Sequence, residues 1–156
     1  MGGAEIKYVS DVFKSNWIAP VGQYIDKFEN GLSLISNNYH FAALSSGTAA
    51  IHLALILLNV KSGDNVLCSS FTFAASANPI KYLGANPIFI DSEEQTWNMC
   101  PKLLESAIID SIEKGVVPKA IILVHLYGMP AKINEIIKIA DTYNIPVIED
   151  VAEALG

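Results

Sequence analysis

KAIILVHLYGMPAKINEIIKIADTYNIPVIED, residues 119–150, contains the clearest alternation of strand and helix patterns in this chain. The apolar run 120–124 predicts a strand buried on both faces. Residues 132–143 follow, with isoleucine at 133, 136 and 137 and alanine at 140 on one face of a predicted helix. Residues 146–148 predict a further strand, which ends at Glu149-Asp150. This order of elements predicts a parallel pair of strands joined by a helical crossover.

The same alternation extends toward the N-terminus, without a linker or an internal repeat. Predicted strands are 41–44, 66–68 and 87–90, and predicted helices are 9–15, 24–35, 49–58, 72–83 and 101–114. Residues 16–22 are predicted to form a loop, because Pro20 and Gly22 interrupt the pattern. We therefore predict an α/β fold, one domain or part of one, with a mainly parallel sheet and helices on both faces.

The composition argues against several classes of protein. The chain has 156 residues, a formal net charge of −6, and 51% hydrophobic and 17% charged residues, so we expect a folded core. An acidic balance without a basic stripe argues against a nucleic-acid partner. We expect no membrane partner and a cytoplasmic location, because no apolar run could span a bilayer and no signal peptide is visible. Cys68 and Cys100 lack metal-site spacing, which predicts buried, reduced thiols and no metal site.

Polar and aromatic residues follow the predicted strands at the points where each strand ends. These residues are Ser45–Thr48, Ser69–Phe73, Asp91, His125–Gly128 and Glu149–Asp150. Ligands of open parallel sheets bind outside the carboxyl ends of the strands. We therefore expect hydroxyl groups, aromatic rings, a histidine and carboxylates to gather along one edge of the sheet.

The sequence Ser46-Gly47-Thr48 has two interpretations. Gly47 would let the backbone approach an anion, Thr48 offers a hydroxyl, and the helix that follows presents free N–H groups, so a phosphate could bind here. The alternative is an ordinary helix N-cap.

Asp150, Phe73 and His125 also leave alternatives open. The carboxylate of Asp150 could hold a protonated heteroaromatic nitrogen, a ribose hydroxyl or a metal, or could cap whatever follows the strand. Phe73 could stack on a planar ring or pack in the core. His125 is interpreted as a structural histidine with satisfied ring nitrogens, and His52 as a packing residue in an apolar helix.

Five ordered segments resemble the DegT–StrS family of sugar aminotransferases. Ser46–Leu55 resembles its "SGTAALHLAL" segment, and Ser70–Asn78 resembles "tFvATanai". The remaining segments are Phe89–Asp91 with Thr96–Met99, Val124–Pro130 and Val147–Gly156, which resemble "fvDvd…tynid", "vHlyGqpa" and "viEDaAqalGa". Together the five segments cover nearly the whole chain, which resembles the N-terminal portion of the large domain of a fold-type I enzyme dependent on pyridoxal 5'-phosphate (PLP).

The resemblance implies a role for five residues of this sequence. Gly47 and Thr48 would hold the cofactor phosphate, and Phe73 would stack on the pyridine ring. Asp150 would pair with the pyridinium nitrogen. Glu153 stands where many members have glutamine near the phenolic oxygen of the cofactor.

The resemblance also implies a substrate class. Glutamate at position 153 and the loop 16–22 are similar to the subgroup that acts on UDP-linked 4-keto-6-deoxy-N-acetyl sugars. The expected reaction moves an amino group, donated by glutamate, onto the keto group of a nucleotide-linked sugar for glycan biosynthesis. The family builds its active sites at the interface of a homodimer, so a dimeric full-length protein is expected.

The resemblance places the family's Schiff-base lysine beyond the segment that ends at Gly156, and none of the lysines of this chain stands in a matching position. Residues 1–156 are therefore expected to be a truncated portion of the domain, without a catalytic residue of their own and without turnover in isolation. Three alternatives stay open. They are a sugar dehydratase of the same family, a non-catalytic α/β binding fragment, and a Rossmann-type dinucleotide binder, which the absence of GxGxxG disfavours.

Overall fold

The structure is a computed structural model that describes residues 2–154 of the chain. Met1 and Leu155-Gly156 lie outside the described residues, so the last two positions of the Val147–Gly156 segment are not described. The chain divides into two compact units, Met1–Ala43 and Leu44–Gly156. The prediction that residues 1–156 are one portion of a larger domain stays a prediction.

The larger unit is built on a sheet of four parallel strands in the order β2-β1-β3-β4. The strands are β1 Asn65–Ser69, β2 Asn86–Ile90, β3 Ala120–Val124 and β4 Val147–Asp150. Ser69 is opposite Ile90, and Val124 is opposite Asp150, so the last residues of all four strands lie at one edge of the sheet. The predicted parallel sheet is confirmed.

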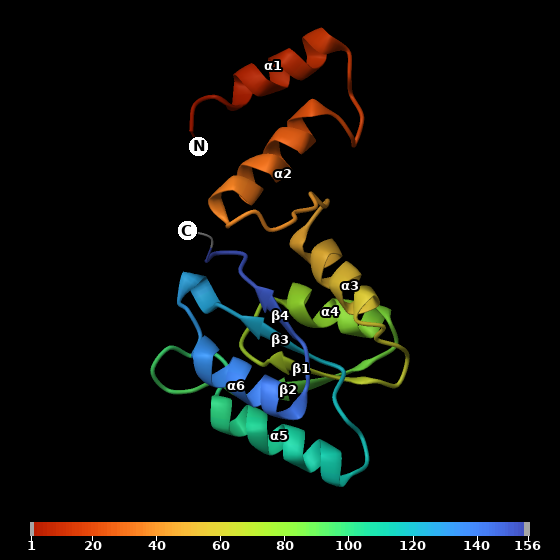
Figure 1. The fold of residues 1–156 in the computed structure, drawn as a ribbon, viewed down its shortest axis with the longest axis vertical. Coiled ribbons are helices and arrows are strands. Elements are labelled where there is room, and N and C mark those ends of the chain that lie inside the picture. The colour runs from red at the N-terminus through yellow and green to blue at the C-terminus, as the bar shows by residue number, and fades with distance from the viewer. Residues whose placement is uncertain (1, 155–156) are drawn as a thin grey trace. The chain divides into compact units, whose positions relative to one another are not determined.

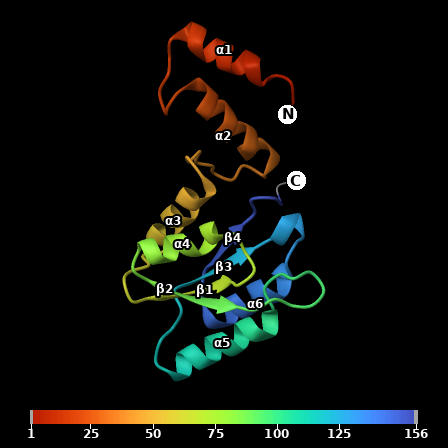
Figure 2. The ribbon, with the colours of Figure 1, turned by 180° about the vertical axis from the view of Figure 1, so that it is seen from behind.

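Helices cover both faces of this sheet (Figure 1, Figure 2). They are α3 Gly47–Leu57 and α4 Ala74–Tyr82 on one face, and α5 Pro101–Glu113 and α6 Ile133–Tyr143 on the other. Local sequence sets several helix ends. Pro101 begins α5 with its fixed φ, and Asn144 ends α6 in the left-handed conformation, at a φ of 54°. The predicted α/β fold class is confirmed.

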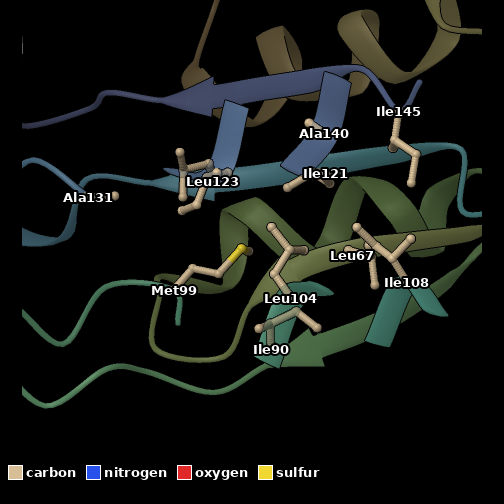
Figure 3. Close-up of a cluster of buried hydrophobic side chains, with 11 residues drawn as sticks. Leu67, Ile90, Met99, Leu104, Ile108, Ile121, Leu123, Ala131, Ala140 and Ile145 are labelled. Carbon is tan, nitrogen blue, oxygen red and sulfur yellow. The ribbon is translucent and has the colours of Figure 1, made fainter. Parts of the chain in front are cut away.

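Alternate strand residues face two separate core clusters. Leu67, Ile121 and Leu123 belong to the cluster that contains Leu104 and Ile108 of α5 (Figure 3). On the opposite face, Val66, Cys68 and Ile122 pack with residues of α3 and α4. In β4, Val147 packs against the first cluster and Ile148 against the second. Because strand side chains alternate, Glu149 is directed to the α5/α6 face and Asp150 to the α3/α4 face.

The smaller unit contains two helices, α1 Glu5–Ser15 and α2 Gln23–Ile35, neither of which has a buried residue. The predicted loop between them is confirmed. The Trp17 indole N–H donates to the Val21 carbonyl at 2.7 Å. Gly22 has a φ of 143°, and a Cβ at this position would lie 2.7 Å from the indole nitrogen. Only glycine fits this loop without displacing the tryptophan ring.

The predicted strand 41–44 is wrong, because none of these residues belongs to a strand. The Ala43 N–H donates to Glu29 Oε1 at 2.7 Å instead of joining a strand ladder. An apolar run forms a strand only where a neighbouring strand pairs with its backbone. The predicted start of α4 is also two residues early, since Phe73 is extended, with φ −70° and ψ 144°. Within residues 2–154, no helix is long and apolar enough to cross a membrane.

Candidate active site

A pocket of about 400 Å³ lies at the carboxyl edge of the sheet. Its walls come from the loop between β1 and α4, from the turn after β3 and from the segment after β4. Phe73, Asp150 and Glu153 all line it, so the structure brings together three of the five predicted site residues. Gly47 and Thr48, at the start of α3, are not among its lining residues.

The Asp150 carboxylate is held by two hydroxyl groups in sequence. The Ser76 hydroxyl donates to Asp150 Oδ2 at 2.7 Å, and the Thr72 hydroxyl lies 2.7 Å from Ser76 Oγ. The Ala152 N–H donates to the other oxygen, Oδ1, over a longer 3.4 Å. Asp150 thus caps the segment after β4 only through this weak contact. Its Oδ1 remains largely available to a ligand.

Cys68 lies behind this carboxylate on the same face of the sheet. Its side chain is fully buried. Burial raises the pKa of the Cys68 thiol to about 12, and the negative charge of Asp150 adds to the shift. The thiol is therefore protonated at neutral pH and is a poor nucleophile. Both cysteines are free, as predicted, although Cys100 is only partly buried.

Phe73 is 82% exposed, which excludes the alternative that it packs in the core of this unit. Its ring is available at the pocket wall. Glu153 is exposed as well, and its backbone approaches the turn after β3. Gly128 in that turn has a φ of 79°, and a Cβ there would lie 2.8 Å from the Glu153 carbonyl oxygen. A glycine is therefore required where these two segments meet.

Both interpretations of Ser46-Gly47-Thr48 are compatible with the start of α3. The Ser46 hydroxyl caps the helix by accepting from the Ala49 N–H at 3.2 Å. The N–H groups of Gly47 and Thr48 belong to the first turn and have no partner within the helix. No atom lies within 4 Å of a Cβ built on Gly47, so the backbone is open to approach there. The anion site stays a prediction.

His125 is a satisfied structural histidine, as predicted. It is 8% exposed, and its Nδ1 accepts from the Ala131 N–H at 3.0 Å. Nε2 must therefore carry the ring proton, which it donates to Glu149 Oε2 at 3.1 Å. Both ring nitrogens are occupied. His52 lies edge-on to Tyr82, with 5.7 Å between ring centroids, in agreement with the predicted packing role.

Two polar side chains that were not predicted as functional residues hold the loop between β2 and α5. Asn98 is 2% exposed, donates to the Met129 carbonyl and accepts from the Leu126 N–H, both at 2.9 Å. Glu93 accepts from the Thr96 N–H at 2.6 Å and forms an ion pair with Lys132 at 3.0 Å. The pKa of Glu93 is lowered to about 2, chiefly by the hydrogen bonds from Thr96 and also by the contact with Lys132. Asn98 lies in the Thr96–Met99 segment that resembles the family, and the spacing of Glu93 and Thr96 is a second sequence signal for this loop.

Ser76 and Thr72 were also missed as site residues. Both lie in the Ser70–Asn78 segment, four residues apart at the start of a predicted helix. That spacing places two side chains on one helix face, which was the available signal. Their partner Asp150 is 74 residues further along the chain from Ser76, so only the fold could reveal the contact.

The parallel sheet, its helix-covered faces and the pocket at its carboxyl edge are those of an α/β domain with a ligand-binding edge. The model of the DegT/DnrJ/EryC1/StrS aminotransferase family matches residues 1–156, and the chain belongs to this family.

Curated relatives and solved structures agree with this membership. The chain is 54% identical over 156 residues to EpsN of Bacillus subtilis, which is named as a pyridoxal phosphate-dependent aminotransferase, and covers 40% of that protein. It is 42% identical over 154 residues to the GDP-perosamine synthase of Escherichia coli O157:H7, covering 99% of this chain and 41% of the relative. A family aminotransferase from Brucella abortus superposes with a TM-score of 0.88 at 35% identity, over 92% of this chain and 39% of that structure.

Spr1654 from Streptococcus pneumoniae, which is named as a sugar aminotransferase and was solved in its PLP form, also superposes with a TM-score of 0.88, at 30% identity over the whole of this chain and 42% of that structure. The chain thus spans about two fifths of the length of the curated relatives it matches.

Proposed function

We propose that this protein, in its full natural length, is a PLP-dependent aminotransferase that makes an amino sugar. It transfers an amino group from glutamate to the keto group of a nucleotide-linked sugar that feeds glycan biosynthesis. Family membership and the names of the relatives support the amino transfer and the sugar. The observation that carries the proposal is the Asp150 carboxylate, anchored on one oxygen by Ser76 and lining a pocket beside the exposed ring of Phe73.

The residues of this chain fit the cofactor. A planar, phosphorylated heteroaromatic ring needs an acceptor for its ring N–H, an aromatic surface and an anion site. Asp150 supplies the acceptor, Phe73 supplies the aromatic surface, and the first turn of α3 at Gly47 and Thr48 offers free N–H groups to the phosphate. Glu153 lines the same pocket and would lie near the phenolic oxygen. When bound, PLP supplies an electron sink that allows nitrogen to move between donor and acceptor.

Asp150 has the most specific task among these residues. Its carboxylate would accept the hydrogen bond of a protonated ring nitrogen and would stabilise that proton by charge. The contact with Ser76 keeps the carboxylate from rotating away from the pocket. Phe73 would exclude water from one face of the ring, and the N-terminus of α3 would hold the phosphate. The lysine that attaches the cofactor covalently is proposed to lie in sequence outside residues 1–156.

The finer substrate assignment is also a proposal. Glu153 and the loop 16–22 support a UDP-linked 4-keto-6-deoxy sugar, whereas the names of two relatives specify a GDP-linked product. We propose the UDP-linked class. We further propose that the full-length protein is a cytoplasmic homodimer.

The test uses the full-length protein with PLP, glutamate carrying an isotopic label on its nitrogen, and matched UDP- and GDP-linked 4-keto-6-deoxy sugars. Mass spectrometry should find the label in the sugar nucleotide, with 2-oxoglutarate formed in equal amount. Faster transfer to the UDP-linked sugar supports the nucleotide assignment, and faster transfer to the GDP-linked sugar overturns it. A sugar that loses a hydroxyl group without gaining nitrogen would identify a dehydratase and contradict the aminotransferase proposal.

A further inference from the structure

We infer that Ser76 is a positioning residue for Asp150, and that Thr72 is the second member of the same hydrogen-bonded chain. The inference rests on the proposed function, because it assigns these hydroxyl groups to the ring-nitrogen contact of the cofactor. Neither residue touches the ring nitrogen in this account. They act through the carboxylate.

The contacts are short, and the Ser76 hydroxyl that joins them is buried. Ser76 Oγ is 2.7 Å from Asp150 Oδ2 and 2.7 Å from Thr72 Oγ1. The Ser76 side chain is completely buried. Water therefore cannot substitute for a lost hydroxyl at this position without entering the core.

The direction of these two hydrogen bonds follows from counting protons. A serine hydroxyl carries one proton, and an ionised carboxylate can only accept. The Ser76 hydroxyl therefore donates its only proton to Asp150, and Thr72 must donate its own proton to Ser76 Oγ. Each donor polarises the next, which strengthens the final bond to the carboxylate. The chain is ordered from Thr72 through Ser76 to Asp150.

The fold places these hydrogen-bonded hydroxyl groups at the start of α4. Phe73 is the N-cap of α4, so Ser76 lies in its first turn and Thr72 immediately precedes the helix. The positive end of the α4 dipole, which attracts negative charge, thus lies beside the carboxylate. Asp150 Oδ2 is anchored in this way, and Oδ1, with only the 3.4 Å contact from Ala152, remains to accept from a ligand.

A second buried serine shows what an ordinary helix serine does. Ser111 in α5 is 6% exposed and donates to the Ala107 carbonyl of its own helix at 2.7 Å. That is the usual bond of a serine within a helix. Ser76 instead donates to a strand residue on another element. Ser111→Ala is therefore a matched control that removes a buried hydroxyl from the other face of the sheet.

The experiment compares PLP with its 1-deaza analogue, in which a C–H group replaces the ring nitrogen. Dissociation constants of both are measured on the full-length apoprotein by fluorescence titration. Since both molecules carry the same aldehyde and phosphate, their ratio reports the ring-nitrogen contact alone. The wild type should bind PLP more tightly than the analogue.

We expect Ser76→Ala to weaken PLP binding about tenfold and to change binding of the analogue by less than about twofold. Ser76→Thr, which restores a hydroxyl, should recover most of the loss. Ser111→Ala should leave both constants unchanged. Thr72→Val keeps the side-chain shape and should weaken PLP alone by about threefold, and this variant carries the test if Ser76→Ala does not fold.

Equal weakening of PLP and the analogue by Ser76→Ala would show a merely structural role and overturn the inference. So would unchanged PLP binding in both Ser76→Ala and Thr72→Val. A wild-type protein that binds no PLP would overturn the proposed function, and this inference with it. A wild type that prefers PLP while Ser76→Ala retains the full preference would overturn this inference alone.

Discussion

The two faces of the sheet meet at the same carboxyl edge, but their polar groups are arranged differently. On the α5/α6 face, both ring nitrogens of His125 and both ends of the Asn98 amide have hydrogen-bond partners within the protein. On the α3/α4 face, Asp150 has one well-anchored oxygen and one oxygen with a single long contact. The exposed ring of Phe73 lines the same pocket as this carboxylate.

The difference separates structural polar groups from a candidate binding group. A buried polar group whose bonds are all made within the protein holds its neighbours in place and has no capacity left for a ligand. A carboxylate fixed on one side and open on the other is prepared to accept a further hydrogen bond. His125 directly follows β3 and Asp150 is the last residue of β4, yet only Asp150 retains this capacity.

The largest expected effect is the loss of activity in Asp150→Asn. If activity were retained, the contrast between the two faces of the sheet would not hold. Asp150→Asn should lower amino transfer by the full-length protein about a hundred- to a thousandfold, because an amide cannot stabilise a protonated ring nitrogen by charge. The asparagine oxygen can still accept from Ser76, so the thermal midpoint should change little. Steady-state kinetics and calorimetry measure the two quantities.

Asp110→Asn is the matched control for this variant. Asp110 is an exposed carboxylate on α5 whose partner is Lys114 in the same helix, and the activity should be unchanged. An Asp150→Asn protein with full activity would remove Asp150 from the proposed site.

Substitution of Asn98 should have the opposite result, with a large effect on stability and little effect on ligand binding. Asn98→Ala leaves the Leu126 N–H and the Met129 carbonyl without their partner and should lower the free energy of unfolding by about 1–3 kcal/mol. The preference for PLP over its 1-deaza analogue should survive. Urea titration gives the first quantity and fluorescence titration the second. Gln95→Ala, an exposed change in the same loop, is the control.

If Asn98→Ala were as stable as the wild type, the hydrogen bonds of this loop would not hold the turn after β3. If Asn98→Ala abolished the preference for PLP, the polar groups on the α5/α6 face would also contribute to ligand binding.

The smallest effect at neutral pH is expected for Glu93 and has a distinct pH dependence. The pKa of Glu93 is lowered from an ordinary 4.5 to about 2, chiefly by the hydrogen bonds from Thr96. Because the folded-state pKa is the lower one, ionised Glu93 stabilises the fold above pH 4.5, and this contribution is lost as the pH falls toward 2. Glu93→Gln should therefore be less stable than the wild type at pH 7, with a difference that shrinks over this range.

Urea unfolding at a series of pH values measures this difference. Glu94→Gln, at the exposed neighbouring residue, should show no such trend. A Glu93→Gln deficit that stays constant from pH 7 to pH 3 would mean that the charge of Glu93 does not contribute.

Much of the fold could be predicted because it depends on local patterns. The apolar run 120–124 became β3 with the predicted bounds, and Pro101 began α5 as predicted. The failed strand at 41–44 was just as apolar, but strand formation depends on a pairing partner, which local sequence does not reveal. Phe73 shows the same limit, since sequence left core packing and stacking open and only its exposure decided between them.

The sequence alone determined the order of strands and α-helices from α3 onward, the buried character of β3, the glycine and proline positions at turns, and the residues that end each strand of the sheet. These depend on side-chain periodicity and backbone preference, which act within a few residues. Tertiary structure alone decided that Ser76 reaches Asp150, that His125 is fully satisfied, and that Phe73 is exposed beside a pocket. Those outcomes require contacts between residues far apart in the chain, and only the paired strands and packed helices bring such residues within hydrogen-bonding distance.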